Sequence, residues 1–122
     1  MSDFQSLGGE ETLRPIIRSF IDRVYNDTII GFFFMSIDKE QLIQREFEFA
    51  AQHLGAPITY TGTPIAQAHQ KHPINNGHFH RRMWLLEQTL REHHVDEAII
   101  ERWLAHNKAF LKAVTNGMDC QD

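Results

Sequence analysis

Histidine is the residue type with the widest chemical use in this 122-residue chain, which carries eight of them. Two pairs have short spacings, His69 with His72 and His78 with His80. Neutral imidazoles bind transition metals, so each pair is a candidate for part of a metal site. However, His72 precedes Pro73, where helix is disfavoured, and residues two apart on a helix do not share a face. The spacings therefore argue against a dedicated multi-histidine site.

His69 differs from the other histidines in the segment that precedes it. Thr63 and Pro64 are suited to an N-cap and a first helical position, and small residues lead from there to a helix end near Gln70. This pattern predicts a short helix that holds His69 at its end. Position alone favours an ordinary surface or helix-end histidine, so a ligand role needs further support.

Other familiar chemical signatures are missing from the sequence. It contains no Gly-rich phosphate loop, HExxH motif, nucleophile elbow or CxxC pair. The single cysteine, Cys120, excludes a disulfide framework and a cysteine-based metal site, and it favours a reducing cytoplasm. A formal net charge of -4 argues against nucleic-acid binding, which needs a clustered positive face.

Length and hydropathy predict one soluble domain over residues 1–122, with an N-terminal segment at 1–9 and a loose tail at 117–122. The N-terminus lacks the pattern of a secretory signal, and the longest uncharged apolar stretch is 29–37, against the roughly 20 residues of a membrane helix. We therefore expect a cytoplasmic protein without a membrane segment. Any cofactor must lie within or against the single core.

Helical periodicity runs through the chain and predicts an all-α fold. An amphipathic helix is expected from Leu13 to about Tyr25, with Pro15 in its first turn. The apolar segment 27–34 fits either a buried strand or a buried short helix. Further on, Tyr60 is expected in an extended loop. Later helices are expected to begin at caps Asn76 and Asp96, the last of them ending at Gly117.

The helix expected from Asp38 to Leu54 is apolar on two faces. The second face carries Leu42 and Phe49, and Glu46 interrupts it. A helix with two apolar faces is packed between two apolar surfaces. The residues of the first face are Ile43, Phe47, Ala50, Ala51 and Leu54.

Several motifs occur in an order and spacing that resemble the truncated haemoglobins, the short two-over-two globins. They are Gly8-Gly9, the Phe20 helix, Phe33-Phe34, Leu54-Gly55-Ala56-Pro57, Tyr60-Thr61-Gly62-Thr63-Pro64 and His69. The resemblance covers nearly the whole chain. The run from Leu54 to His69 is similar to group I, whereas Phe79 with Arg81 is similar to group III.

The resemblance implies one haem b per chain in a two-over-two helical sandwich. It implies that His69 is the proximal iron ligand and that Phe34 packs on the porphyrin face. Arg45 and Tyr60 are then candidates to bind the haem propionates, with Lys71 or His72 as further candidates. The remaining candidate cofactor contacts are Leu42, Phe49, Ile74 and Phe79.

The chain departs from the family at positions expected to face the bound ligand. Ile21 stands where these proteins commonly have a ligand-binding tyrosine, and Arg82 where other branches often have tryptophan. Glu46 stands where glutamine is frequent; a carboxylate there must be neutral, paired or turned outward, and a one-residue register error makes it a plain surface glutamate. Glu46 and Arg82 are a candidate catalytic pair, because peroxide cleavage needs a proton carrier and a positive charge.

The resemblance implies a protein that binds dioxygen, nitric oxide or carbon monoxide at the iron, with redox chemistry on nitric oxide or peroxide. Loss of the tyrosine hydroxyl predicts weak retention of dioxygen, which disfavours oxygen storage, and oxygen transport remains among the expected roles. No histidine is expected above the iron, so the sixth site is expected to be vacant or to hold water. The alternatives are a haem peroxidase-like enzyme that uses Glu46 and Arg82, or a haem-free globin-fold interaction module. A catalytic cycle implies an external electron donor, and the oligomeric state is expected to be a monomer or weak homodimer.

Overall fold

The computed structural model describes residues 1–62 and 75–110, and all its regular elements within those ranges are helical, which confirms the all-α prediction. Two predicted features, the short helix ending near Gln70 and the part of the last helix beyond Phe110, lie outside the described residues. The described elements are α1 (Asp3–Leu7), α2 (Glu10–Asn26), the 3-10 helix η1 (Gly31–Phe34), α3 (Lys39–His53), α5 (Asn76–Glu92) and α6 (Glu97–Lys108).

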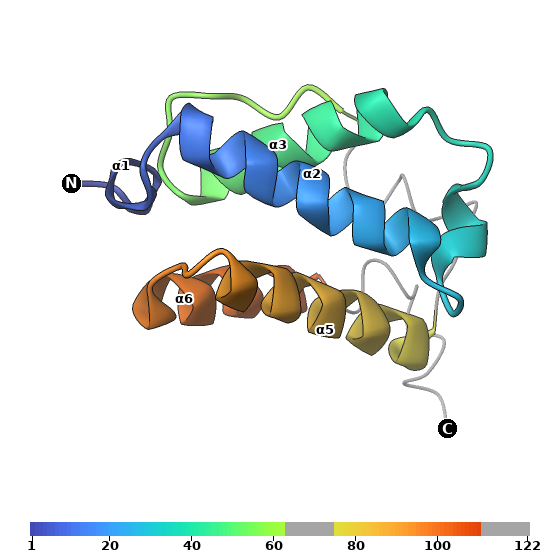
Figure 1. The fold of residues 1–122 in the computed structure, drawn as a ribbon. Coiled ribbons are helices and arrows are strands. Elements are labelled where there is room, and N and C mark those ends of the chain that lie inside the picture. The colour runs from blue at the N-terminus through green and yellow to red at the C-terminus, as the bar shows by residue number, and fades with distance from the viewer. Residues whose placement is uncertain (63–74, 111–122) are drawn as a thin grey trace.

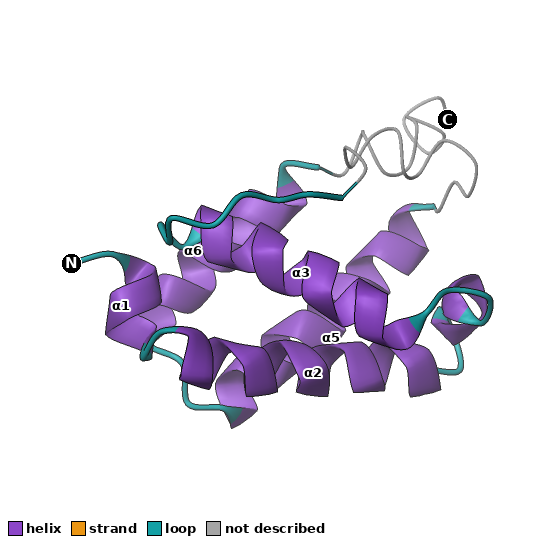
Figure 2. Ribbon diagram, turned by 90° about the horizontal axis from the view of Figure 1, so that it is seen from above, coloured by secondary structure: helices purple, strands orange, loops and turns teal. Residues whose placement is uncertain are grey.

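Four helices form two layers, with α2 and α3 above α5 and α6 (Figure 1). Helix α2 packs against both α3 and α5, and α6 packs against α5 and α3. Seen from above, the two helices of each layer lie side by side over those of the other layer (Figure 2). This is the two-over-two arrangement expected from the sequence.

The core lies between the two layers. Helix α2 supplies the apolar stripe predicted from its periodicity, and α6 supplies Trp103 from the opposite layer. The large fully buried side chains include Phe20, Phe47, Leu86 and Ile100, one from each of the four helices. Burial of such side chains provides the main driving force for folding, at roughly 1.5–3 kcal/mol each.

Helix α2 begins earlier than its apolar pattern indicates. The carbonyl of Gly9 accepts hydrogen bonds from the amides of Thr12 and Leu13, so the helix starts at Glu10. Pro15 therefore lies in the second turn, and its prediction in the first turn was wrong. The reason is that the first turn consists of polar residues, which the hydrophobic pattern does not register.

The segment after α2 is a short helix rather than a strand, but it is only partly buried. Ile30 and Gly31 are buried, whereas Phe32 is 58% exposed. Only glycine fits at position 31, because a Cβ there would lie 2.7 Å from the carbonyl oxygen of Tyr25. Asp27 shapes the turn: its carboxylate accepts hydrogen bonds from the amides of Ile29 and Ile30 at 3.0 Å each.

Two of the three N-cap residues predicted within the described ranges are confirmed, and the third lies one residue earlier than predicted. Asp38 and Asp96 cap α3 and α6 as predicted, through carboxylate oxygens that accept amide hydrogen bonds in the first turn. Helix α5 is capped by Asn75 and not by Asn76, because the Asn75 side chain accepts from the amide of His78 at 2.8 Å. Gly55, with φ of 96°, follows α3 in the left-handed conformation that stops a helix.

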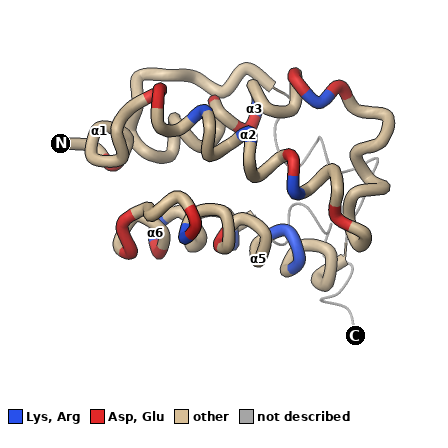
Figure 3. The backbone as a smooth tube through the Cα atoms, in the orientation of Figure 1, with Lys and Arg blue, Asp and Glu red and all other residues tan. Residues whose placement is uncertain are grey.

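Acidic and basic residues are interspersed along both layers (Figure 3). Some of them join separate elements: Arg18 of α2 pairs with Glu40 of α3, and Arg102 of α6 pairs with Asp3 of α1. In the part of the chain that the structure describes, no helix is both long and apolar enough to span a membrane.

Candidate functional site

Most of the candidate site residues come from three described elements and one loop. Helix α3 carries Leu42, Arg45, Glu46 and Phe49, α5 carries Phe79 and Arg82, η1 carries Phe34, and Tyr60 lies in the loop after α3. The expected iron ligand His69 lies outside the described residues, together with Ile74, Lys71 and His72.

Helix α3 has the two apolar faces that the sequence predicts. Ile43, Phe47 and their neighbours are buried in the core, whereas Leu42 and Phe49 on the other face are half-buried. Phe49 meets Tyr60 edge-on, with ring centroids 5.8 Å apart, and it lies 5.2 Å from His106 of α6. The second face thus presents aromatic and aliphatic side chains that are only half-buried.

Glu46 and Arg82 form an ion pair between the two layers. Nη2 of Arg82 donates to Oε1 of Glu46 at 2.6 Å, and the two side chains are only 19% and 21% exposed, respectively. The guanidinium also lies 5.0 Å from the ring centroid of Phe20 on α2. The carboxylate was expected to be neutral, paired or turned outward, and the structure shows it paired. The attraction of the arginine offsets the cost of removing the charge from water.

A second acceptor orients Arg82, and sequence reasoning missed it. Nη1 of Arg82 donates to Oδ1 of Asn107 at 2.9 Å. The amide of Asn107 is oriented in turn, because its Nδ2 donates to the carbonyl oxygen of Trp103. Asn107 is a buried polar residue one turn after Trp103 on the apolar face of α6. A polar residue at an apolar position was the feature of the sequence that could have identified it.

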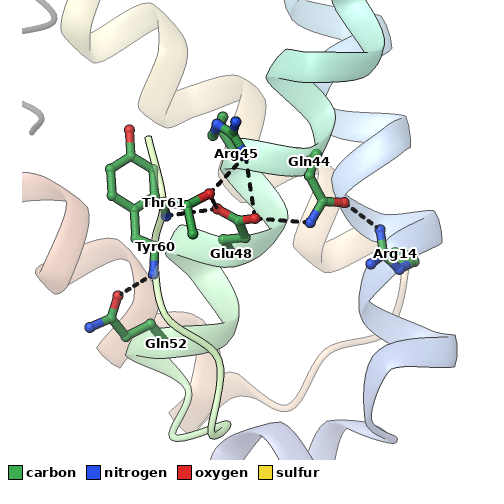
Figure 4. Close-up of polar contacts among 7 residues, drawn as sticks. All are labelled: Arg14, Gln44, Arg45, Glu48, Gln52, Tyr60 and Thr61. Carbon is green, nitrogen blue, oxygen red and sulfur yellow. Dashed lines mark hydrogen bonds and ion pairs between the residues drawn. The ribbon is translucent and has the colours of Figure 1, made fainter. Parts of the chain in front are cut away.

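Glu48 is a second polar residue, after Asn107, that the sequence did not single out (Figure 4). Its carboxylate is buried and accepts from the amide and hydroxyl of Thr61, at 2.9 and 2.8 Å, and from Nε2 of Gln44 at 3.0 Å. Burial alone raises the pKa of Glu48, but the hydrogen bonds from Thr61 and Gln44 and the charge of Arg45 together hold that pKa below its usual value. Glu48 is therefore ionised at neutral pH.

Arg45 and Tyr60, the two candidate propionate partners, meet at Gly62. A Cβ at Gly62 would lie 2.5 Å from the Tyr60 hydroxyl oxygen and 2.9 Å from Cδ of Arg45, so a larger residue would displace these two side chains. Burial, and then the negative charge of Glu46, raise the pKa of Tyr60, which keeps its hydroxyl protonated at neutral pH. One guanidinium and one hydroxyl therefore lie near each other beside the second face of α3.

The residue at the family's tyrosine position, Ile21, has no hydroxyl. Ile21 is buried in the core. Tyr25, one turn later on α2, uses its hydroxyl to donate to the carbonyl oxygen of Ile37 at 2.7 Å. Among the described residues, the polar groups at or beside the second face of α3 include those of Glu46, Arg82, Arg45 and Tyr60, together with the ring of His106 beside Phe49.

Phe34 lies on η1 and Phe79 on α5. Phe34 stacks with Tyr25, with ring centroids 6.0 Å apart. Phe79 is almost fully buried and, with Met83 and Leu104, lines a groove of about 500 Å³ between α5 and α6. Within residues 1–62 and 75–110, no group of three or more His, Cys, Asp or Glu side chains is arranged to hold a metal ion.

Sequence comparisons place the chain among known proteins. The model of the family described as bacterial-like globin matches residues 2–116. The group 1 truncated hemoglobin GlbN of Mycolicibacterium paratuberculosis is 36% identical over 78 residues, which are 64% of this chain and 57% of that protein. The group 1 truncated hemoglobin of Tetrahymena pyriformis is 29% identical over 97 residues, 80% of each chain.

Solved structures agree with the sequence comparisons. The truncated hemoglobin from Tetrahymena pyriformis in its Fe(III) form has a TM-score of 0.86 and 25% identity, and the match covers 93% of this chain and 97% of that one. The 2/2 hemoglobin from Synechococcus sp. in the cyanomet state, with covalently attached heme, has a TM-score of 0.89 over 95% of this chain and 99% of that one. Its 22% identity supports the shared fold alone. The chain belongs to the bacterial-like globins, and its fold is that of a truncated, two-over-two haemoglobin similar to group I.

Proposed function

We propose that this protein is a haem globin that binds diatomic gases at an iron held by His69. Haem b, the cofactor of this fold, supplies an iron to which dioxygen, nitric oxide or carbon monoxide binds. The observation that carries the proposal is the second face of α3. Its half-buried Leu42 and Phe49 suit a flat apolar ring, and Arg45 and Tyr60 beside it offer the cation and hydroxyl that propionates need.

His69 is proposed as the ligand from the family resemblance. The loop that leads toward it is held against α3, because the amide of Tyr60 donates to Gln52 and that of Thr61 donates to Glu48. The match of the bacterial-like globin family model over residues 2–116 counts against a haem-free interaction module. We therefore place the haem-binding reading above it.

Peroxide or nitric oxide chemistry is the second candidate function, and the Glu46–Arg82 pair favours it. A carboxylate can accept or deliver a proton at Oε1 or Oε2, and the adjacent guanidinium keeps a positive charge beside it. The buried Asn107 limits rotation of that guanidinium. A catalytic cycle would take electrons from an external donor. We further propose a monomer or weak homodimer located in the cytoplasm.

Haem titration of the purified apoprotein tests the proposal. Absorption spectra should show saturation at one haem per chain, and His69→Ala should lose the wild-type ferrous spectrum. His80→Ala is the matched control, because His80 is an exposed histidine on α5. A wild-type protein that binds no haem, or a His69→Ala spectrum identical to wild type, would contradict the proposal.

A further inference from the structure

The buried carboxylate of Glu48 does more than stabilise its own helix. Both of its oxygens are used: Oε1 accepts from the amide and hydroxyl of Thr61, and Oε2 accepts from Gln44 and, at 3.4 Å, from Arg45. A buried charge is costly unless hydrogen bonds satisfy it. The two shortest of these contacts go to Thr61, so the main target of the carboxylate is the loop that follows α3 (Figure 4).

The loop runs back along α3 in the opposite direction, held by side chains at successive turns. The amide of Tyr60 donates to Oε1 of Gln52 at 3.1 Å, and Thr61 binds Glu48, one turn earlier on the helix. Gly62 then packs on Arg45, a further turn back. Glu48 is the central contact of this series and the only charged acceptor in it.

We call the contacts of Glu48 with Thr61, Gln44 and Arg45 the Glu48 clamp. This clamp is also connected to α2, the other helix of its layer. Gln44 donates to Glu48 and accepts from Nη1 of Arg14 on α2 at 3.1 Å. The Arg14 guanidinium lies 4.0 Å from the ring centroid of the core residue Phe47. Movement of the Glu48 carboxylate is therefore resisted by contacts that reach α2 and the core.

We propose that Glu48 is a positioning residue for haem retention: it fixes Thr61 and thereby the start of the segment that carries His69, eight residues later. The same bonds set the place of Arg45, whose Nη1 donates to Oγ1 of Thr61 at 2.9 Å, and of Tyr60 beside it. This inference rests on the proposed function, in which His69 binds the iron and Arg45 and Tyr60 bind the propionates.

The test is the rate of haem loss to an excess of a high-affinity apoglobin, measured on the holoprotein. Glu48→Gln removes the charge with little change in shape and should increase the rate about tenfold, the equivalent of one strong hydrogen bond. Thr61→Val should increase it also, whereas Thr61→Ser, which keeps the hydroxyl, should remain near wild type. The Glu48→Gln and Thr61→Val effects should be less than additive, because both remove the same contact.

Two controls separate positioning from stability. Glu40→Gln makes the same chemical change at an exposed position of α3, where the partner is Arg18, and should leave haem loss within twofold of wild type. Asp27→Asn removes a buried charge elsewhere, so it lowers stability without touching the clamp. A second readout is amide hydrogen exchange at Thr61, which should accelerate in Glu48→Gln and stay slow in Asp27→Asn.

The outcomes are distinguishable. Faster haem loss in Glu48→Gln, with both controls near wild type, supports the proposal. Haem loss at the wild-type rate in Glu48→Gln, or equal acceleration in Asp27→Asn, overturns the positioning role while haem binding stands. A wild-type protein that takes up no haem overturns the proposed function and this inference together.

Discussion

Arg82 of α5 donates to Glu46 of α3 across 2.6 Å, and this contact joins the two helical layers through a pair of oppositely charged side chains. The arginine is also bound by Asn107 of α6 and packed near Phe20 of α2. Arg82, itself on α5, therefore contacts each of the other three helices of the sandwich. A pair so placed has a fixed geometry, which is what a proton carrier and a charge stabiliser require.

Glu46→Gln should slow the reaction of the ferric protein with peroxide by about 100-fold, the lower end of the usual contribution of a general acid–base group. The amide keeps the shape of the side chain but cannot carry the proton. Stopped-flow absorbance measures the rate. Glu87→Gln is the matched control, since Glu87 pairs with Arg91 away from this face. An unchanged rate in Glu46→Gln would remove the pair from the chemistry.

Ile21→Tyr should slow dioxygen release from the ferrous protein by about tenfold, because one hydrogen bond to the bound ligand is worth about 1.4 kcal/mol. Ile21→Phe introduces the ring without the hydroxyl and should release dioxygen at nearly the wild-type rate. Both variants should lose stability, since Ile21 is buried and the site is already filled. Equal release rates in the two variants would show that position 21 does not face the ligand.

Asp27→Asn should lower the free energy of unfolding by about 2 kcal/mol at pH 7. The Asp27 side chain is only 4% exposed, and its Oδ1 accepts from Nη2 of Arg81 at 2.6 Å. The hydrogen bonds from Arg81 hold the pKa of Asp27 below its usual value, although burial opposes them.

The pH dependence of this stability follows from the direction of the pKa shift. A carboxylate with a lowered pKa stabilises the native state above its unfolded pKa of about 4, and the contribution disappears as pH falls through the native pKa. The difference between wild type and Asp27→Asn, measured by urea unfolding, should therefore shrink in acid. A difference that stays constant from pH 7 to the acid limit would contradict the role given to the Asp27 charge.

Local patterns in the sequence were sufficient to predict the four helices of the two layers, whereas the Glu46–Arg82 pair was predicted with the help of the family resemblance. The apolar stripe of α2, the caps Asp38 and Asp96, and the double-faced α3 are local features, and each is present in the structure. Errors arose where polar side chains decide a boundary. Asn75 and Asn76 are equally good caps by type, and only the contact with His78 distinguishes them.

The residues that the sequence did not reveal act through contacts between distant segments. Glu48 resembles any other acid on a helix surface until Thr61, 13 residues later, folds back over it. Asn107 is separated from Arg82 by 25 residues, and its amide gains a function only when α6 packs on α5. Such positions become recognisable only once the packing of the helices is known.

Resonance Raman spectroscopy of the unliganded ferrous protein shows directly whether His69 holds the haem iron in this globin. We expect an iron–histidine stretching band in wild type and in His80→Ala. The band should be lost in His69→Ala, and an iron–imidazole band should appear when free imidazole is added to this variant. An iron–histidine band that persists unchanged in His69→Ala without imidazole would contradict the assignment of His69 as the iron ligand.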